Sequence, residues 1–165
     1  MKVFGIVGWK NSGKTGLMER LVREISSRGF SVSTIKHAHH TFDIDQEGKD
    51  SFRHRMAGAQ EVLLSSQNKW ALIHELRNKC EPDLKSLLQK LSLVDLVLVE
   101  GYKYESYPKL EAYRTENKRV PFALTGNEII AMASDTTHPD VNLPIFDLNK
   151  TSEIATFILA KVELL

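Results

Sequence analysis

The sequence predicts an α/β fold with a mostly parallel central sheet flanked by helices. Two short runs, residues 3–8 (VFGIVG) and 94–101 (VDLVLVEG), are almost continuously apolar, which is typical of strands buried on both faces of a parallel sheet. Between them, apolar residues recur every four positions from Leu17 to Ile25, which indicates an amphipathic helix that Gly29 ends. Residues 30–35 add a second strand, and strand, helix and strand together form a βαβ unit, normally with a right-handed crossover.

The rest of the chain also alternates short strands and helices. Residues 36–48 are polar and rich in turn formers, so they are predicted to form a long functional loop. No internal repeat, low-complexity tract or linker interrupts the chain, and we expect one domain over residues 1–165. The remaining expected elements are a helix at 50–57, strands at 61–65 and 70–76, a helix at 83–91, strands at 109–113, 129–133 and 145–147, and a helix at 154–164.

Composition excludes several classes of partner. The formal net charge is +1, so no overall field attracts nucleic acid or an acidic membrane surface. The single cysteine, Cys80, excludes an internal disulfide and suits a reducing compartment. The N-terminal apolar run is too short for a signal peptide, and no run reaches the roughly 18 residues that a membrane span needs. We therefore expect a cytoplasmic protein without membrane or nucleic-acid partners.

Residues 8–15 (GWKNSGKT) match the phosphate-binding pattern G-x-x-x-x-G-K-[ST], between the first strand and the first helix. In this P-loop the glycines let successive backbone N–H groups point at phosphate oxygens, and the helix N-terminus adds its free N–H groups. Lys14 would reach the β- and γ-phosphates, and the Thr15 hydroxyl would bind Mg²⁺. The fold class is thus a P-loop NTPase-type sandwich. The predicted nucleotide-binding residues of the loop are Gly8, Asn11, Ser12, Gly13, Lys14, Thr15 and Gly16.

Two acidic residues follow predicted strands. Glu100 ends the second apolar run, where it would hold Mg²⁺ directly or through water, or orient an attacking water, so Lys14 and Glu100 are the catalytic candidates. The N-K-x-D pattern by which common GTPases read guanine is absent. Asp135 either presents its carboxylate to a guanine edge or is an ordinary turn residue, and the sequence leaves both interpretations open.

Several segments together resemble the MobB family of molybdopterin-guanine dinucleotide biosynthesis adaptor proteins. They are GWKNSGKT, TIKHAHHTFDID, GKDSFRHRMAGA, LVLVEGYKYESYPKLEAYR and AMASD, and they cover most of the chain in the family's order. The resemblance implies a homodimer that binds GTP with Mg²⁺ and hydrolyses it slowly at most. It also implies association with the MobA guanylyltransferase, which joins GMP to molybdopterin and so makes the guanine dinucleotide form of the molybdenum cofactor.

The segment IKHAHHTFDID places three histidines, at 37, 39 and 40, beside two aspartates. A transition-metal site, a solvated loop and one wall of a ligand pocket are the three interpretations. On an extended segment His37 and His39 share a face, yet zinc sites more often use wider or helical spacings, and no cysteine accompanies them. The segment leaves a strand beside the P-loop strand, so we favour the pocket, with Asp43 and Asp45 near Mg²⁺.

A second phosphate-bearing ligand such as molybdopterin would bind at this edge of the sheet through basic side chains, since arginine, lysine and imidazole all suit phosphate. The predicted second-ligand or partner pocket consists of Lys36, His37, His39, Arg53, Lys103 and Lys109.

An alternative function is that of a P-loop small-molecule kinase, or of an ATP-dependent carboxylate-activating ligase of the dethiobiotin synthetase type. Lys36, Arg53 and Lys109 would equally bind a small acid. A kinase is expected to carry an arginine-rich lid and a base for a substrate hydroxyl, and the sequence makes neither evident. We therefore prefer the interpretation of this chain as an adaptor.

Overall fold

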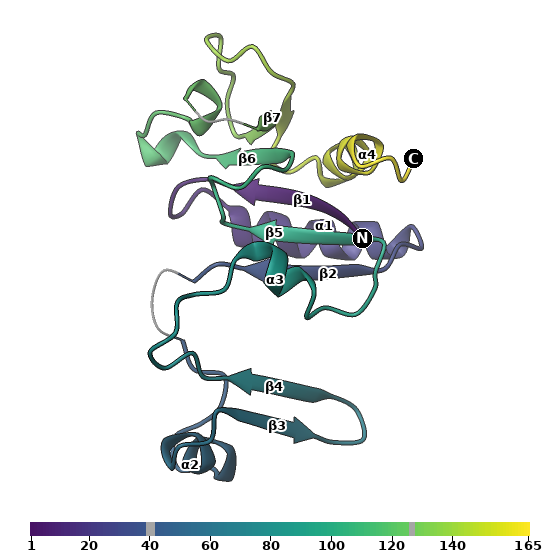
Figure 1. The fold of residues 1–165 in the computed structure, drawn as a ribbon. Helices are drawn as coiled ribbons and strands as arrows, with labels where there is room; N and C mark the ends of the chain where they lie inside the picture. Colours follow the sequence, from purple (N-terminus) through teal and green to yellow (C-terminus); the bar gives the residue numbers. More distant parts are fainter. Residues whose placement is uncertain (39–41, 126–127) are drawn as a thin grey trace. The chain divides into compact units, whose positions relative to one another are not determined.

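The computed structural model describes residues 1–38, 42–125 and 128–165 (Figure 1). The chain divides into two compact units: residues 1–37 together with 91–165 form the first, and residues 38–90 form the second. The expectation of a single domain over the whole chain stays a prediction.

The first unit is built on a six-stranded sheet in the order β2-β5-β1-β6-β7-β8, with every neighbouring pair parallel. This confirms the predicted α/β fold with its parallel sheet. The apolar run that opens the chain forms β1, which lies inside the sheet between β5 and β6 (Figure 1). The strands are β1 (Lys2–Val7), β2 (Val32–Lys36), β5 (Leu96–Glu100), β6 (Lys109–Tyr113), β7 (Ile129–Ser134) and β8 (Ile145–Asp147).

Two helices, α1 (Lys14–Ser27) and α4 (Thr151–Lys161), pack against each other and supply much of the core of this unit. The four-residue spacing works as predicted, because Leu17, Leu21 and Ile25 are fully buried. Gly29 follows α1 with φ 91°, a left-handed conformation that glycine adopts without strain. Two short 3₁₀ helices, η1 (Thr115–Asn117) and η2 (Phe122–Leu124), lie between β6 and β7.

The second unit contains α2 (Asp50–Met56), an antiparallel hairpin of β3 (Glu61–Ser65) and β4 (Trp70–His74), and α3 (Leu84–Leu88). The two strands were expected, and they form a sheet of their own. α3 is shorter than the predicted 83–91 helix. It begins after Asp83, whose carboxylate accepts a hydrogen bond from the Ser86 backbone N–H as an N-cap.

Within the described residues, no helix combines the length and the apolar character needed to cross a membrane.

Candidate nucleotide-binding site

The loop between β1 and α1 takes conformations that only its glycines allow easily. Gly8 has φ 149°, and a Cβ atom placed there would lie 2.3 Å from the carbonyl oxygen of Ala112. Gly13 has φ 87° and directly precedes α1. The loop therefore turns tightly against β6 and delivers its last residues to the helix N-terminus, as phosphate binding requires.

Ser12 is the one buried polar residue of the loop. Its side chain is fully buried, and its Oγ finds no hydrogen-bond partner among the residues that the structure describes. A buried hydroxyl without a partner is costly, so this oxygen is available to a ligand in the loop. Of the other predicted loop residues, Asn11 (φ 64°) and Thr15 are exposed and Gly16 is half-buried in the first turn of α1.

Lys14 is half-buried, and its Nζ donates a hydrogen bond of 2.6 Å to the carbonyl oxygen of Trp9. Burial lowers the pKa of the Lys14 ammonium; the carboxylate of Glu100 opposes that shift, and the positive charges of Lys103 and Lys36 add to it. The ammonium is thus held inside the loop by one backbone oxygen, within the field of Glu100.

Glu100 lies at the carboxyl end of β5, next to the ends of β1 and β2. It aligns with Ile6 on one side and Lys36 on the other, because all three strands are parallel and in register. Its side chain is 12% exposed, and one carboxylate oxygen lies 3.6 Å from Nζ of Lys36. The structure therefore brings Glu100 to the edge of the sheet from which the P-loop emerges, as expected.

The oxygen donors at this edge fit Mg²⁺. Over the described ranges, no group of three or more histidine, cysteine, aspartate or glutamate side chains converges on one point. Mg²⁺ is usually held by only one or two protein oxygens, with water and phosphate as its other ligands. The Thr15 hydroxyl and the Glu100 carboxylate are donors of that kind.

An aromatic stack borders the loop, and the sequence did not predict it. The rings of Trp9 and Phe122 lie 4.4 Å apart, and Nε1 of Trp9 donates to the carbonyl oxygen of Val120. Nζ of Lys103 lies 5.1 Å from the Trp9 ring and 4.8 Å from the Phe122 ring, and the guanidinium of Arg119 lies 5.3 Å from Trp9. The predicted pocket residue Lys103 is thus fixed beside the loop by these rings.

A cavity of about 480 Å³ opens at the carboxyl ends of β7 and β8. Asp135 lines it, and its Oδ1 accepts hydrogen bonds of 3.0 Å from the backbone N–H and the hydroxyl of Thr115. Partial burial would raise the pKa of Asp135, but these bonds, together with the positive charge of Arg114, lower it, so the group is a carboxylate at neutral pH. The lining residues are Ser134, Asp135, Thr136, Thr137, His138, Pro139, Ile145, Phe146 and Asp147.

Three predicted pocket residues, Lys36, His37 and Lys103, lie where β2 and β5 end. The His37 backbone N–H donates to the Glu100 carbonyl oxygen, and its ring lies 4.6 Å from that of Tyr102. Gly101 (φ 97°) makes this approach possible, because a Cβ atom there would lie 3.0 Å from Cβ of His37. His39 lies outside the described residues.

Lys109, also predicted for the second pocket, is fully buried. Its ammonium donates to the carbonyl oxygens of Glu105 and Tyr107 and lies 4.6 Å from the Tyr107 ring. Burial lowers the pKa of this ammonium, while Glu128 and Glu105 oppose the shift. In this arrangement Lys109 supports the loop before β6, so a ligand role would require its ammonium to leave these carbonyls.

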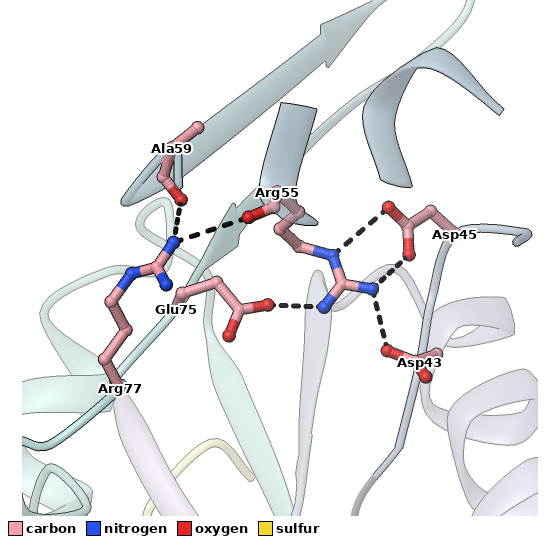
Figure 2. Close-up of polar contacts among 6 residues, drawn as sticks. All are labelled: Asp43, Asp45, Arg55, Ala59, Glu75 and Arg77. Atoms are coloured by element: carbon pink, nitrogen blue, oxygen red, sulfur yellow. Dashed lines mark hydrogen bonds and ion pairs between the residues drawn. The ribbon is translucent and has the colours of Figure 1, made fainter. Parts of the chain in front are cut away.

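Asp43 and Asp45, predicted to lie near Mg²⁺, belong to the second unit and pair with Arg55 (Figure 2). Nη2 of Arg55 lies 2.9 Å from Asp43 and 2.8 Å from Asp45, and Nη1 contacts Glu75. The hydrogen bond to Arg55 is the main reason that the pKa of Asp45 is lowered. Both aspartates therefore have a cation already, and their role toward Mg²⁺ stays a prediction.

Arg53, the remaining predicted pocket residue, is exposed on α2 in the second unit. It lines a cavity of about 620 Å³ with neighbours from the same helix and from the preceding loop. Its part in a second-ligand pocket stays a prediction.

A parallel sheet with a glycine-rich loop between its first strand and first helix defines an α/β protein of the P-loop NTPase type. Comparison with known proteins agrees. The family model "Molybdopterin guanine dinucleotide synthesis protein B" (MobB) matches residues 3–135. The chain belongs to the MobB family.

Relatives and solved structures extend over nearly the whole chain. A molybdopterin-guanine dinucleotide biosynthesis adapter protein of Haemophilus influenzae is 38% identical over 157 residues, which are 94% of this chain and 86% of that protein. The protein of the same description from Escherichia coli is 34% identical over 160 residues, covering 95% and 91%. The crystal structure of Bacillus subtilis MobB has a TM-score of 0.77 at 27% identity and covers 98% of both chains. The expected adapter role in molybdopterin guanine dinucleotide biosynthesis is confirmed.

Proposed function

We propose that this MobB-family adapter binds GTP with Mg²⁺ at its P-loop, hydrolyses it slowly at most, and acts as a cytoplasmic homodimer beside a MobA-type guanylyltransferase. The observation that carries the proposal is the loop itself. It offers a buried Ser12 hydroxyl without a partner among the described residues and a Lys14 ammonium held by one backbone oxygen. A phosphate in the loop would satisfy both groups, since each forms stronger hydrogen bonds with an anion.

Thr15 and Glu100 would hold Mg²⁺, the first through its hydroxyl and the second directly or through a water. When bound, Mg²⁺ neutralises charge on the β- and γ-phosphates. Glu100 is also the candidate that orients an attacking water. Nζ of Lys36 lies 3.6 Å from this carboxylate, so the carboxylate already contacts one cation of the protein.

The cavity at the ends of β7 and β8 is our candidate for the guanine base. One oxygen of Asp135 is fixed by Thr115, which orients the carboxylate in the cavity wall. The Watson–Crick edge of guanine presents two neighbouring donors, N1–H and the 2-amino group, whereas the same edge of adenine presents an acceptor at N1. A carboxylate therefore favours guanine, and a mismatched base leaves it without partners.

Molybdopterin is the proposed second ligand, through its phosphate. Lys36, His37 and Lys103 support this, because they come from the ends of two adjacent strands beside Glu100. An imidazole ring can offer an N–H donor to a phosphate oxygen, so His37 suits this ligand.

The hairpin of β3 and β4 supports a homodimer. Leu63 pairs with Leu72 across the strands, and Trp70 lies two residues from Leu72 on the same face. These side chains are 61%, 45% and 65% exposed. An apolar face of this kind is typical of an interaction surface, and a second copy of the chain would cover it.

One experiment tests the proposed function as a whole. Purified protein is titrated with GTP and with ATP in the presence of Mg²⁺, with and without a MobA-type guanylyltransferase loaded with molybdopterin. We expect GTP to bind on the order of 100-fold or more tightly than ATP, and GTP-bound adapter to increase guanine dinucleotide formation. A preference for ATP, or fast turnover with a small substrate alone, would instead support the kinase or ligase alternative, which the comparisons do not favour.

A further inference from the structure

Arg114, which directly follows β6, brings its guanidinium to the P-loop. A Cβ atom placed at Gly13 would lie 3.1 Å from Nε of Arg114 and 3.5 Å from Nη2. Gly13 is the last residue before α1, so this cation lies against the part of the backbone that surrounds a bound phosphate.

Arg114 is exposed, and over residues 1–38, 42–125 and 128–165 its guanidinium makes no hydrogen bond or salt bridge, although its positive charge acts on the carboxylate of Asp135. Other arginines of the same unit are engaged: Arg20 donates to Thr151 and the Leu148 carbonyl, and Arg28 pairs with Glu24. Arg114 is therefore placed by its backbone and its neighbours while its planar fork stays available.

The neighbours of Arg114 indicate how a bound nucleotide would be oriented. Thr115, the next residue, donates to Asp135 in the cavity wall at the ends of β7 and β8. On the other side, Gly13 is followed by Lys14, the residue that reaches the β- and γ-phosphates in a P-loop. Arg114 thus lies between the candidate base cavity and Lys14.

In a nucleoside triphosphate, the α- and β-phosphates occupy that interval between base and γ-phosphate. We infer that Arg114 binds the α,β-diphosphate part of the nucleotide through its guanidinium, from within the same chain. This inference rests on the proposed nucleotide binding and adds to it a residue and the portion of the ligand that the residue contacts. The planar fork suits two phosphate oxygens at once, and the resulting hydrogen bonds are charge-assisted.

The test compares GTP and GDP, which share the diphosphate, by calorimetric titration of the full chain with Mg²⁺. Arg114→Gln removes the charge and the fork. We expect this substitution to weaken the binding of GTP and of GDP by the same factor, roughly 10- to 100-fold. Arg114→Lys, which keeps the charge alone, should lie between the two. Lys118→Gln is the matched control: it removes one exposed positive charge from the same segment and should leave both affinities within about twofold.

Three results would overturn the inference. In the first, GTP and GDP bind to Arg114→Gln as they do to the original protein. In the second, only the binding of GTP is weakened in Arg114→Gln, which would place the guanidinium at the γ-phosphate. In the third, Lys118→Gln weakens nucleotide binding as much as Arg114→Gln does, which would indicate a general electrostatic attraction and not a direct contact. Failure of the unsubstituted protein to bind either nucleotide would overturn the proposed function as well. A thermal melt of each variant checks its fold, and Arg114→Lys gives the readout if Arg114→Gln is unstable.

Discussion

At the scale of single residues, the site depends on which side chains already have partners in the protein. Asp43 and Asp45 have the same chemistry as Glu100, yet Arg55 occupies both. Glu100 instead lies 3.6 Å from a mostly exposed Lys36 and acts on the Lys14 ammonium in the loop. Asp135 is intermediate, because Thr115 binds one of its oxygens and the cavity borders the residue. Glu100 and Asp135 are therefore the carboxylates that we assign to the nucleotide.

Asp135→Asn tests the base assignment. The amide keeps an oxygen to accept from Thr115, but its NH₂ group donates where the carboxylate would accept from guanine. We expect the affinity for GTP to fall roughly 10-fold or more and the affinity for xanthosine triphosphate to rise, since xanthine carries an oxygen in place of the 2-amino group. Competitive titration measures the ratio of the affinities for GTP and xanthosine triphosphate. Asp140→Asn, at an exposed position of the same connection between β7 and β8, is the control, and an unchanged preference for GTP in Asp135→Asn would exclude the assignment.

Sequence patterns predicted where the loop and Glu100 lie in the fold, because both positions depend on local order. The loop follows a buried strand and opens a helix, and Glu100 ends a parallel neighbour. The position of Lys109 was not predictable in this way, because alternation along five residues does not reveal that β6 is central and that its ends are covered. The pairing of Trp9 with Phe122 joins distant parts of the chain, and no local pattern signals it.

At the scale of elements, η2 shapes the P-loop from outside. Glu111, fully buried in β6, accepts hydrogen bonds of 2.9 and 2.8 Å from the backbone N–H groups of Phe122 and Ala123. Phe122 in turn stacks on Trp9 within the loop. The strand thus holds the 3₁₀ helix, and the helix holds the loop.

Glu111→Ala should lower the free energy of unfolding by about 2–3 kcal/mol, because two partly buried N–H groups lose their acceptor. Burial raises the pKa of Glu111, against the two backbone hydrogen bonds that lower it. A raised pKa in the folded state means that this group's contribution to stability is present in full below the unfolded pKa and is lost as pH rises through the folded pKa. Glu111→Gln should therefore flatten the dependence of stability on pH in that range.

Urea unfolding at several pH values measures both effects. Glu116→Ala on η1, an exposed position, is the control and should change the stability by less than about 0.5 kcal/mol. Equal stability of Glu111→Ala and the original protein would show that η2 does not depend on this carboxylate.

The hairpin is the element whose strands were predicted but whose separate sheet was not. The sequence of 61–65 and 70–76 indicates strands, but it does not say which strands pair with the main sheet. The exposure of Leu63, Trp70 and Leu72 became visible only in the structure.

At the scale of the whole molecule, that hairpin face is the surface that we expect a second copy to cover. Trp70→Ser together with Leu72→Ser should shift the protein from dimer to monomer in light scattering coupled to size-exclusion chromatography, because apolar area would no longer be removed from water. Leu93→Ser, at a residue that is 88% exposed in the first unit, is the control and should leave the mass unchanged. A dimer that persists in the double variant would place the interface elsewhere.

Calorimetric titration of Lys14→Ala with GTP and Mg²⁺ tests most directly whether the P-loop of this adapter binds GTP. Arg23→Ala, an exposed position on the same helix, removes one charge away from the loop and serves as the control. We predict that Lys14→Ala weakens GTP by roughly 100-fold or more, while Arg23→Ala binds as the original protein does and both keep its melting temperature within a few degrees. Equally tight binding of GTP to Lys14→Ala would exclude the P-loop as the GTP-binding site.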